Sequence, residues 1–455
     1  MHTLIESVSG IRGIFGAGLD AGVLVRYALA FGTWCRRRTG EANCTVVVGR
    51  DARVSGEICA QIVTATLRSV GINVVDAGLA CTPTVAMGVL MERAQGGIIL
   101  SASHNPEQWN ALKLLNSRSE FLAPDEVLEL QRLARNMEPP SHADIPIGSL
   151  RVRNFTDPHI EAICRLDFVD IKAIAERDYS VAVDGINSVG AIALPRLLKR
   201  LGVRSVHVIN GDVSGRFAHP AEPLPEHLEG TMAFVRQVEA DLGLVVDPDA
   251  DRLALIDDNG CYVSEELTQV IAADFLWQRR TGPFVTNLSS SRAIDDLAAR
   301  YGEKVHRSAV GEINVVKAMQ AHEAVLGGEG NGGVILPDLH YGRDALVGAA
   351  IVLQQLADRG EPLSQYRQSL PAYVISKNKL TVDTPDEVLS AFADRHAARD
   401  ISTVDGVKVN FDVGWVHIRK SNTEPIIRIY AEARTRASAD DLARWAIVDI
   451  RQENP

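Results

Sequence analysis

The chain is poor in cysteine, in aromatic residues and in long apolar runs. Its 455 residues include six cysteines, none of them in a Cys-x-x-Cys pair or at metal-like spacing. We therefore interpret the cysteines as small core residues of a protein from a reducing compartment. No run of about 18 apolar residues predicts a membrane span, and the first residues lack the basic and apolar regions of a signal peptide. The expected location is the cytoplasm.

Positive charge is also in the minority, since 47 Lys and Arg face 58 Asp and Glu and leave a net charge of -11. This balance argues against a general nucleic-acid surface, which needs a basic stripe. It leaves room for a small anionic substrate, because a few arginines can make a local positive pocket. Hydrophobic content of 46% is typical of a globular protein, and the length suits several domains of roughly 100–150 residues each.

Three strand-like apolar runs, separated by helical stretches, recur three times along the chain. Strands that alternate with helices predict βαβ units and mostly parallel sheets covered by helices. One helix is expected between Ser55 and Val70, with Ser55 as its cap. From about Leu370 the pattern favours a small antiparallel sheet with two helices. The nine runs are 45–48, 73–75 and 97–100; 180–183, 205–209 and 242–246; and 283–286, 304–306 and 324–326.

The loops after the third run of each group are dense in polar residues and glycine. Ligands of open α/β sheets bind beyond the carboxyl ends of the strands, so equivalent domains would offer these loops to one shared site. The loops read Ser101-Ala-Ser-His-Asn-Pro106, Asp247-Pro-Asp-Ala-Asp-Arg252 and Gly327-Gly-Glu-Gly-Asn-Gly-Gly333.

The first two loops carry a candidate nucleophile and a candidate metal site. Ser103 lies just past a strand end, where a serine can act as a covalent carrier, although Ser-His-Asn-Pro also suits a simple turn. Asp247, Asp249 and Asp251 repel one another at this spacing unless a cation neutralises them, and oxygen ligands select Mg²⁺ or a similar hard ion. A phosphate on Ser103 would supply a fourth ligand. The alternative interpretation of the aspartates is an acidic surface turn.

Two further loops have the composition of sugar and phosphate sites. Glu329 and Asn331 can hydrogen-bond neighbouring sugar hydroxyls, and the glycines around them allow a close approach of the backbone. The segment Arg419-Lys-Ser-Asn-Thr-Glu-Pro425 combines a guanidinium, hydroxyls, an amide and backbone N–H groups, as a phosphate cradle does. Arg428, on the next strand, is a second contact candidate. A surface hairpin is the alternative.

Isolated basic residues near these loops remain open between two interpretations. Arg12 either stabilises charge at the shared site or lies on the surface, and Arg252 is close enough to the aspartates to meet a substrate oxygen. Lys113, placed between leucines, is either a partly desolvated amine that exchanges protons or a solvent-facing side chain of an alternating strand. The charges of Gly49-Arg-Asp-Ala-Arg53 are expected to brace neighbouring loops.

The set of motifs resembles the α-D-phosphohexomutase family, the phosphoglucosamine mutase, phosphoglucomutase and phosphomannomutase group. The resemblance rests on five motifs that occur in the family's order over nearly the whole chain. They are Ser9-Gly-Ile-Arg-Gly13, Ser101-Ala-Ser-His-Asn-Pro106, Asp247-Pro-Asp-Ala-Asp-Arg252, Gly328-Glu-Gly-Asn-Gly332 and Arg419-Lys-Ser-Asn-Thr-Glu-Pro425.

The resemblance implies three related α/β domains with mixed, mostly parallel sheets (1–149, 150–252 and 253–367) and a C-terminal α+β domain (368–455) around a central cleft. It implies a phosphoryl group on Ser103 and one Mg²⁺ held by Ser103, Asp247, Asp249 and Asp251. Arg12, Lys113 and His104 would serve catalysis, although His104 is open between binding phosphate and shaping its loop. Substrate contacts would come from Arg252, Glu329, Asn331, Arg419, Ser421, Asn422, Thr423 and Arg428.

Several positions depart from the family's usual motifs. Pro248 and Ala250 stand where glycines are usual, which is expected to stiffen the loop without removing a ligand. Asn331 and Gly333 replace a serine and a histidine of the sugar loop, and Asn422 replaces a glycine of the phosphate loop. The resemblance therefore implies least about substrate specificity.

The expected reaction interconverts hexose 6-phosphate and hexose 1-phosphate through phosphorylated Ser103, a 1,6-bisphosphate intermediate and a bisphosphate primer. Phosphoglucosamine mutase activity is the preferred prediction, and a dual phosphoglucomutase/phosphomannomutase is the first alternative. A metal-dependent phosphosugar phosphatase and a non-catalytic phosphosugar-binding protein are the alternatives from other classes. The expected partner is the small hexose phosphate alone, with no nucleic acid or membrane, and the protein is expected to be a monomer or homodimer.

Overall fold

The computed structural model describes residues 3–40, 43–136, 146–420 and 426–451. The chain forms two compact units, which are described separately. Unit 1 comprises residues up to 268 together with 332–366, and unit 2 comprises 269–331 together with the chain from 367 onward. The chain passes between the units within helices α9 (Glu265–Trp277) and α13 (Leu363–Ser369) and between Asn331 and Gly332. No helix within the described ranges is long and apolar enough to cross a membrane.

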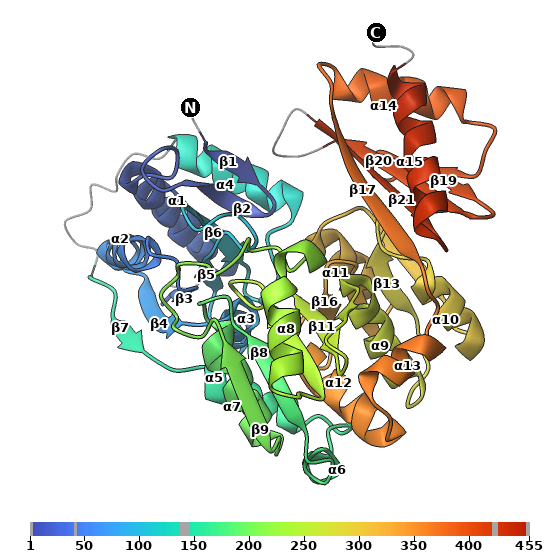
Figure 1. The fold of residues 1–455 in the computed structure, drawn as a ribbon. Coiled ribbons are helices and arrows are strands. Elements are labelled where there is room, and N and C mark those ends of the chain that lie inside the picture. Colours follow the sequence, from blue (N-terminus) through green and yellow to red (C-terminus); the bar gives the residue numbers. More distant parts are fainter. Residues whose placement is uncertain (1–2, 41–42, 137–145, 421–425, 452–455) are drawn as a thin grey trace. The chain divides into compact units, whose positions relative to one another are not determined.

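The first sheet of unit 1 has seven strands in the order β1-β2-β6-β5-β3-β4-β7 (Figure 1). Strands β5, β3, β4 and β7 run parallel, whereas β6 and β2 are antiparallel to their neighbours. In chain order the strands are β1 (Ile5–Ser7), β2 (Gly10–Ile14), β3 (Thr45–Arg50), β4 (Asn73–Leu79), β5 (Gly96–Leu100), β6 (Trp109–Leu115) and β7 (Leu150–Val152).

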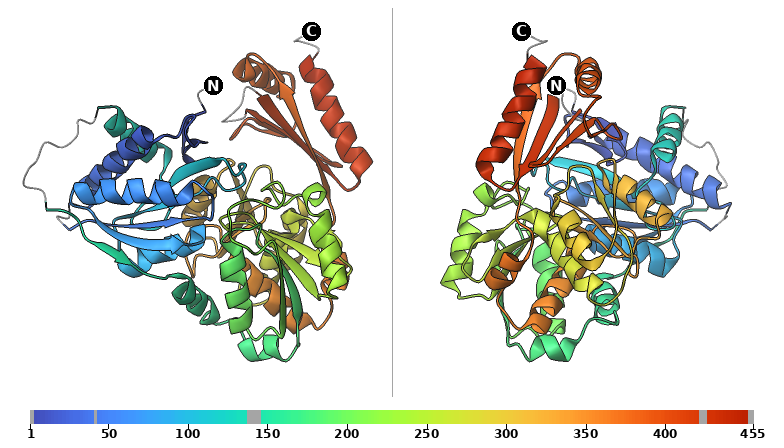
Figure 2. Two further views of the ribbon diagram at one scale, coloured as in Figure 1. Left: turned by 60° about the vertical axis from the view of Figure 1, so that its left-hand side comes forward. Right: turned by 90° about the vertical axis from the view of Figure 1, so that its right-hand side faces the viewer.

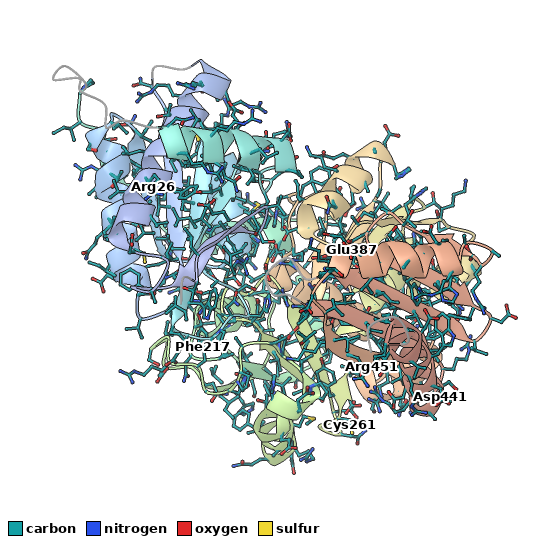
Figure 3. The ribbon with its side chains drawn as sticks, turned by 90° about the horizontal axis from the view of Figure 1, so that it is seen from above. Arg26, Phe217, Cys261, Glu387, Asp441 and Arg451 are labelled. Atoms are coloured by element: carbon teal, nitrogen blue, oxygen red, sulfur yellow. The ribbon has the colours of Figure 1, made fainter. Side chains whose placement is uncertain are left out.

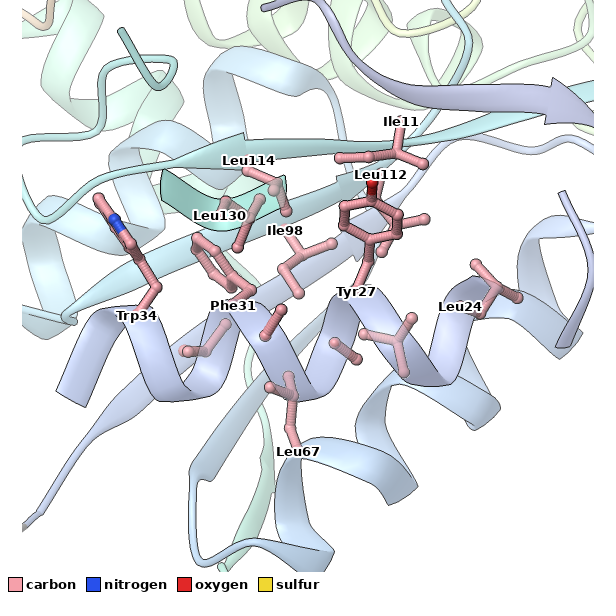
Figure 4. Close-up of a cluster of buried hydrophobic side chains, with 14 of the residues drawn as sticks. Ile11, Leu24, Tyr27, Phe31, Trp34, Leu67, Ile98, Leu112, Leu114 and Leu130 are labelled. Atoms are coloured by element: carbon pink, nitrogen blue, oxygen red, sulfur yellow. The ribbon is translucent and has the colours of Figure 1, made fainter. Parts of the chain in front are cut away.

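Helices cover both faces of this sheet. On one face, α1 (Ala21–Thr39) packs against α2 (Gly56–Ser69) and α4 (Pro124–Asn136), and α3 (Thr82–Glu92) covers the other face. Figure 4 shows Tyr27, Phe31 and Trp34 of α1 pointing from one side of the helix toward the strands. All three are nearly fully buried, and each such side chain contributes about 1.5–3 kcal/mol through removal from water.

The second sheet of unit 1 has five strands in the order β12-β11-β10-β8-β9. Its strands are β8 (Ser180–Asp184), β9 (Ser205–Ile209), β10 (Leu242–Val246), β11 (Leu253–Asp257) and β12 (Tyr262–Val263). The helices of this region are α5 (Thr156–Cys164), α6 (Ile171–Ala175), α7 (Gly190–Arg200) and α8 (Glu229–Gln237), with the short 3₁₀ turn Pro225–His227. Helix α12 (Ala345–Arg359), which follows β16 (Gly333–Ile335), packs on α5, α6, α7 and β11 and so belongs to the same unit.

Unit 2 begins with a third α/β arrangement. Strand β13 (Phe284–Asn287) pairs in parallel with β14 (Val305–Ser308) and with β15 (Leu326–Glu329). Helices α10 (Ala293–Tyr301) and α11 (Glu312–Ala321) connect these strands, and α11 packs on all three.

The C-terminal part of unit 2 is an antiparallel sheet in the order β17-β21-β20-β19-β18, packed against two helices (Figure 2). The elements are β17 (Val374–Thr381), α14 (Pro385–Arg395), β18 (Ile401–Ser402), β19 (Val407–Phe411), β20 (Gly414–Lys420), β21 (Ile426–Ala433) and α15 (Arg436–Arg451). The helices cover the face that carries Val416, Ile418, Ile427 and Ile429, and these side chains form the core. The opposite face carries polar and basic residues.

The predicted threefold repeat and the fold class are confirmed. Each predicted run overlaps a strand, although the run 324–326 overlaps β15 only at Leu326. Each group is ordered third-first-second: β5-β3-β4, β10-β8-β9 and β15-β13-β14. The carboxyl ends of each group's first and third strands therefore lie side by side. Ser55 occupies the N-cap position of α2 as predicted, but its side chain makes no cap bond, because its hydroxyl accepts a hydrogen bond from Asn110 instead.

Candidate active site

Ser103 lies in the turn that follows β5. Its φ of 48° is in the left-handed region, which is uncommon for a residue with a side chain. The Ser101 hydroxyl accepts a hydrogen bond from the Ser103 backbone N–H at 3.0 Å. Ser103 is 4% exposed, and its Oγ donates to Asp247 Oδ2 at 2.6 Å. The structure therefore brings the predicted carrier together with the predicted metal loop across 144 residues of sequence.

The aspartate loop, residues 247–252, follows β10 and is completely enclosed. One oxygen from each of Asp247, Asp249 and Asp251 lies within 4.8 Å of the others, and all three residues are fully buried. Ala250 adopts a φ of 51° between the second and third carboxylates, and its backbone N–H bonds Asp247 O at 2.9 Å. Because the loop is buried, the alternative of an acidic surface turn is wrong.

The donor set of this loop fits a hard divalent cation. Asp249 Oδ1 and Asp251 Oδ1 are buried and have no hydrogen-bond partner among the described residues. Burial raises the pKa of Asp247 well above its usual range, and the neighbouring carboxylates Asp251 and Asp249 raise it further. Buried carboxylate oxygens that lack compensation are the ligands Mg²⁺ takes in proteins. The three aspartates would hold the ion, with Ser103 or a phosphate on it beside them.

Lys113 supplies a positive charge in direct contact with the aspartate loop. It lies on β6, is 4% exposed, and its Nζ is 2.5 Å from Asp249 Oδ2 and 3.7 Å from Asp251 Oδ2. Burial opposes the charge of Lys113, but the carboxylates of Asp249 and Asp251 raise its pKa above the usual value. Lys113 is therefore the desolvated amine of the two interpretations, and the alternative of a solvent-facing side chain is wrong.

Arg12, Arg252 and His104 surround the same turn. Arg12 is buried and donates to Asn105 Oδ1 at 2.9 Å and to Ser9 O at 2.7 Å. Burial, together with the charge of Arg252, lowers the pKa of Arg12 to about 10. Arg252 donates to His104 Nδ1 at 3.0 Å. The charge of Arg252, followed by burial, lowers the pKa of His104 well below its usual value, so the imidazole is neutral and carries its proton on Nε2.

Two residues in contact with the aspartates were missed from the sequence. Thr82 begins α3 and donates through Oγ1 to Asp249 Oδ2 at 2.5 Å, while its N–H bonds Asp249 O at 2.9 Å. Arg343 donates to Asp251 Oδ2 at 2.6 Å. Neither residue lies in a distinctive motif, and they are 167 and 92 residues from their partners, so no local pattern pointed to them.

Glu329 ends β15 in unit 2 and is almost fully buried. Its Oε1 accepts hydrogen bonds from Asn287 Nδ2 at 2.8 Å and from the Gly311 backbone N–H at 3.3 Å. The adjacent Gly330 N–H donates to Ser290 Oγ at 3.0 Å. The sugar loop is thus held against the turn that follows β13. Asn331 ends this part of unit 2 in the next turn.

Arg419 and Arg428 are register partners on β20 and β21, and Lys379 is the partner of Arg428 on β17. Register partners point to the same face of a sheet, so the three cations form a row on the face away from the core helices. Burial lowers the pKa of Arg419, and Glu329 is among the charges that act to raise it. The predicted residues Ser421, Asn422 and Thr423 lie outside the described residues.

A second trio with metal-ligating atoms consists of His159, His340 and Asp344. Asp344 Oδ2 lies 2.9 Å from His159 Nε2 and 3.3 Å from His340 Nε2, and Asp344 Oδ1 caps α12 through the N–H groups of Leu346 and Val347. The other nitrogen of His159 bonds Thr84 Oγ1 at 3.0 Å. Both oxygens of the carboxylate are therefore already used, and we interpret the trio as a buried hydrogen-bond network.

Four domain models of one protein family together match almost the whole chain. The models for the phosphoglucomutase/phosphomannomutase α/β/α domains I, II and III match residues 4–140, 157–260 and 264–373, and the model for its C-terminal domain matches 378–445. The chain belongs to this family, which is the α-D-phosphohexomutase superfamily that its motifs resemble.

The similar proteins are named for two different mutase activities. A phosphoglucomutase/phosphomannomutase of Thermococcus kodakarensis is 37% identical over 96% of both chains. A protein of Methanopyrus kandleri named "probable phosphoglucosamine mutase" is 33% identical over 97% of this chain and 96% of its own. A solved structure of a phosphoglucomutase/phosphomannomutase family protein from Burkholderia thailandensis has a TM-score of 0.83 and 27% identity, covering 98% of this chain and 97% of its own. The protein is accordingly an enzyme of the phosphomutase class.

Proposed function

We propose that this enzyme interconverts glucosamine 6-phosphate and glucosamine 1-phosphate, with Ser103 as the carrier of the phosphoryl group. The observation that carries the proposal is the enclosure of Ser103 Oγ, 2.6 Å from Asp247 Oδ2, within a buried set of carboxylates and cations. The preference for glucosamine rests on the sugar-loop and phosphate-loop variants and on the relative named for that substrate. A dual phosphoglucomutase/phosphomannomutase is the alternative, supported by the name of the 37% identical relative.

Each half of the reaction is a phosphoryl transfer between Ser103 and the sugar. The O1 hydroxyl of glucosamine 6-phosphate attacks the phosphorus on Ser103, the P–Oγ bond breaks, and the hydroxyl proton ends on Oγ. The resulting 1,6-bisphosphate returns its 6-phosphoryl group to Ser103 after it turns over, and O6 regains a proton. Because the carboxylates of Asp249 and Asp251 raise the pKa of the buried Lys113, we assign to Lys113 the proton that Oγ receives, and the hydroxyl proton restores its ammonium.

The remaining site residues would bind and orient the sugar phosphate. Arg12 and Arg252, with the neutral His104, offer donors to phosphate oxygens, and Mg²⁺ held by the three aspartates would supply electrostatic stabilisation of the transferring group. In unit 2, Glu329 and Asn331 would hydrogen-bond the sugar. Arg419 and Arg428, with Ser421, Asn422 and Thr423, would hold the phosphate that does not react. The cytoplasmic location and the monomeric or dimeric state stay predictions.

The test is kcat/KM for glucosamine 6-phosphate, glucose 1-phosphate and mannose 1-phosphate, with Mg²⁺ and glucose 1,6-bisphosphate, while free phosphate is monitored. A preference for glucosamine of tenfold or more, about 1.4 kcal/mol of discrimination, supports the proposal. Equal glucose and mannose rates above the glucosamine rate support the alternative.

Ser103→Ala is the matched negative variant. It should bind the sugar phosphate and lose turnover by orders of magnitude. Phosphate release at the rate of isomer formation would indicate a phosphatase instead, and wild-type binding without any turnover would indicate a binding protein.

A further inference from the structure

Arg53 directs both terminal nitrogens of its guanidinium at the turn that carries Ser103. Arg53 follows β3 and is 1% exposed. It donates to the backbone carbonyls of Asn105 at 2.8 Å, Pro106 at 2.6 Å and Trp109 at 3.0 Å, and also to Ser103 O. Four carbonyls within residues 103–109, here termed the Ser103 segment, therefore share one side chain.

The guanidinium is itself held in place. Its Nε donates to Asp51 Oδ2 at 2.9 Å, and the Arg53 backbone N–H donates to Asp51 Oδ1 at 3.0 Å. Arginine has five N–H donors in a planar arrangement, and all five are used by Asp51 and the four carbonyls. The Phe217 ring (labelled in Figure 3) lies over the guanidinium with 4.9 Å between Cζ and the ring centroid. A lysine has three donors and no plane, so it could not reproduce this set.

The conformation held in this way determines where three functional groups lie. Ser103 takes a left-handed φ of 48°, which a side-chain-bearing residue adopts when its surroundings impose it. Ser101 Oγ accepts the Ser103 N–H and also bonds Asp51. From the same segment, His104 meets Arg252 and Asn105 meets Arg12. A shift of the segment would therefore displace the phosphoryl-carrying Oγ and its cationic neighbours together.

We propose that Arg53, held by Asp51, is a positioning residue for phosphoryl transfer. It acts through the backbone of the Ser103 segment and sets the direction of Ser103 Oγ, both when Ser103 accepts a phosphoryl group from a bisphosphate and when it donates one. The inference rests on the proposed function of Ser103.

The test compares Arg53→Lys with Arg36→Lys. Arg36 is a matched control, because it is partly buried in the same unit and donates to a backbone carbonyl, Val70 O at 2.7 Å, away from the Ser103 segment. The measurements are kcat, KM, the rate of Ser103 phosphorylation by glucose 1,6-bisphosphate (followed by intact mass) and the unfolding temperature.

In Arg53→Lys we expect kcat and the phosphorylation rate to fall on the order of 100-fold, as for a reacting group displaced by about 1 Å, while KM changes by less than about twofold. Arg36→Lys should keep the wild-type values. Unchanged kcat and phosphorylation rate in folded Arg53→Lys would overturn the proposal, as would a rise in KM alone or an equal loss in Arg36→Lys.

Asp51→Asn is the second variant, used also if Arg53→Lys does not fold. It removes the charge that orients Nε but keeps Arg53, so we expect a smaller fall in the same two rates with KM preserved. Wild-type rates in this variant would count against the role of the pair. A wild-type enzyme that neither isomerises any sugar phosphate nor takes a phosphoryl group on Ser103 would instead overturn the proposed function.

Discussion

Among the residues that the structure describes, Lys113 alone offers an ammonium group to the aspartate loop, and its replacement by methionine removes that group while nearly preserving side-chain length. The lysine lies 2.5 Å from Asp249 and 3.7 Å from Asp251, in surroundings where both partners are almost fully buried. Loss of one partner from a buried ion pair costs about 3–5 kcal/mol, because the other charge stays buried without compensation. In a domain of about 150–250 residues, this loss of free energy corresponds to a fall of roughly 6–20 °C in the unfolding temperature.

Magnesium distinguishes this explanation from a simple loss of packing. A bound ion adds about 2.7 kcal/mol when its concentration is 100 times its dissociation constant. In the wild type, Mg²⁺ meets an Asp249 carboxylate already paired with the ammonium. In Lys113→Met, Asp249 has lost that cation, while Asp251 keeps its ion pair with Arg343. We therefore expect Mg²⁺ to raise the unfolding temperature of the variant by several degrees more than that of the wild type.

The assay is thermal unfolding of unphosphorylated protein with EDTA and with saturating Mg²⁺. Lys408→Met is the control, because Lys408 is equally buried but donates to a backbone carbonyl, Leu288 O at 2.7 Å, instead of to an aspartate. Its unfolding temperature should not depend more on Mg²⁺ than that of the wild type. Equal Mg²⁺ shifts in wild type and Lys113→Met would refute the reasoning.

Three further outcomes are expected. Although burial opposes it, the Asp184 carboxylate raises the pKa of His219 above 6.5. The resulting contribution to stability is complete below pH 6.5 and is lost as the pH rises through the pKa of folded His219. The difference in unfolding free energy between wild type and His219→Gln should therefore shrink as the pH rises through the pKa of folded His219. Lys379→Ala should raise KM for the sugar phosphate with little change in kcat, since Lys379 extends the Arg428–Arg419 row; an unchanged KM would exclude it from binding. Asp344→Asn keeps the α12 cap but weakens the bonds with His159 and His340, and chemical denaturation should show a loss of about 1.5–3 kcal/mol; a neutral result would make the network dispensable.

The periodic elements of the fold could be predicted because their signal is local. Buried parallel strands need apolar runs, and the helices between them need an apolar stripe, so the nine runs and the change of pattern near Leu370 stand out in the sequence. The absence of a side-chain cap bond at Ser55 could not be predicted, because a long-range bond from Asn110 occupies its hydroxyl.

The sequence by itself determined which residue types stand at the ends of the strands: Ser103, the three aspartates, Glu329 and Arg419. Loop composition and strand periodicity are both local properties, so they can be recognised from the sequence without knowledge of the fold. Only the tertiary structure decided that Lys113 is buried beside two aspartates and that Thr82 and Arg343 contact the aspartates. It also decided that Arg53 donates to Asp51 and to four carbonyls of the Ser103 segment. These contacts join residues dozens to more than a hundred positions apart, and an arginine or threonine looks the same in sequence whether its partner is water or a buried carbonyl.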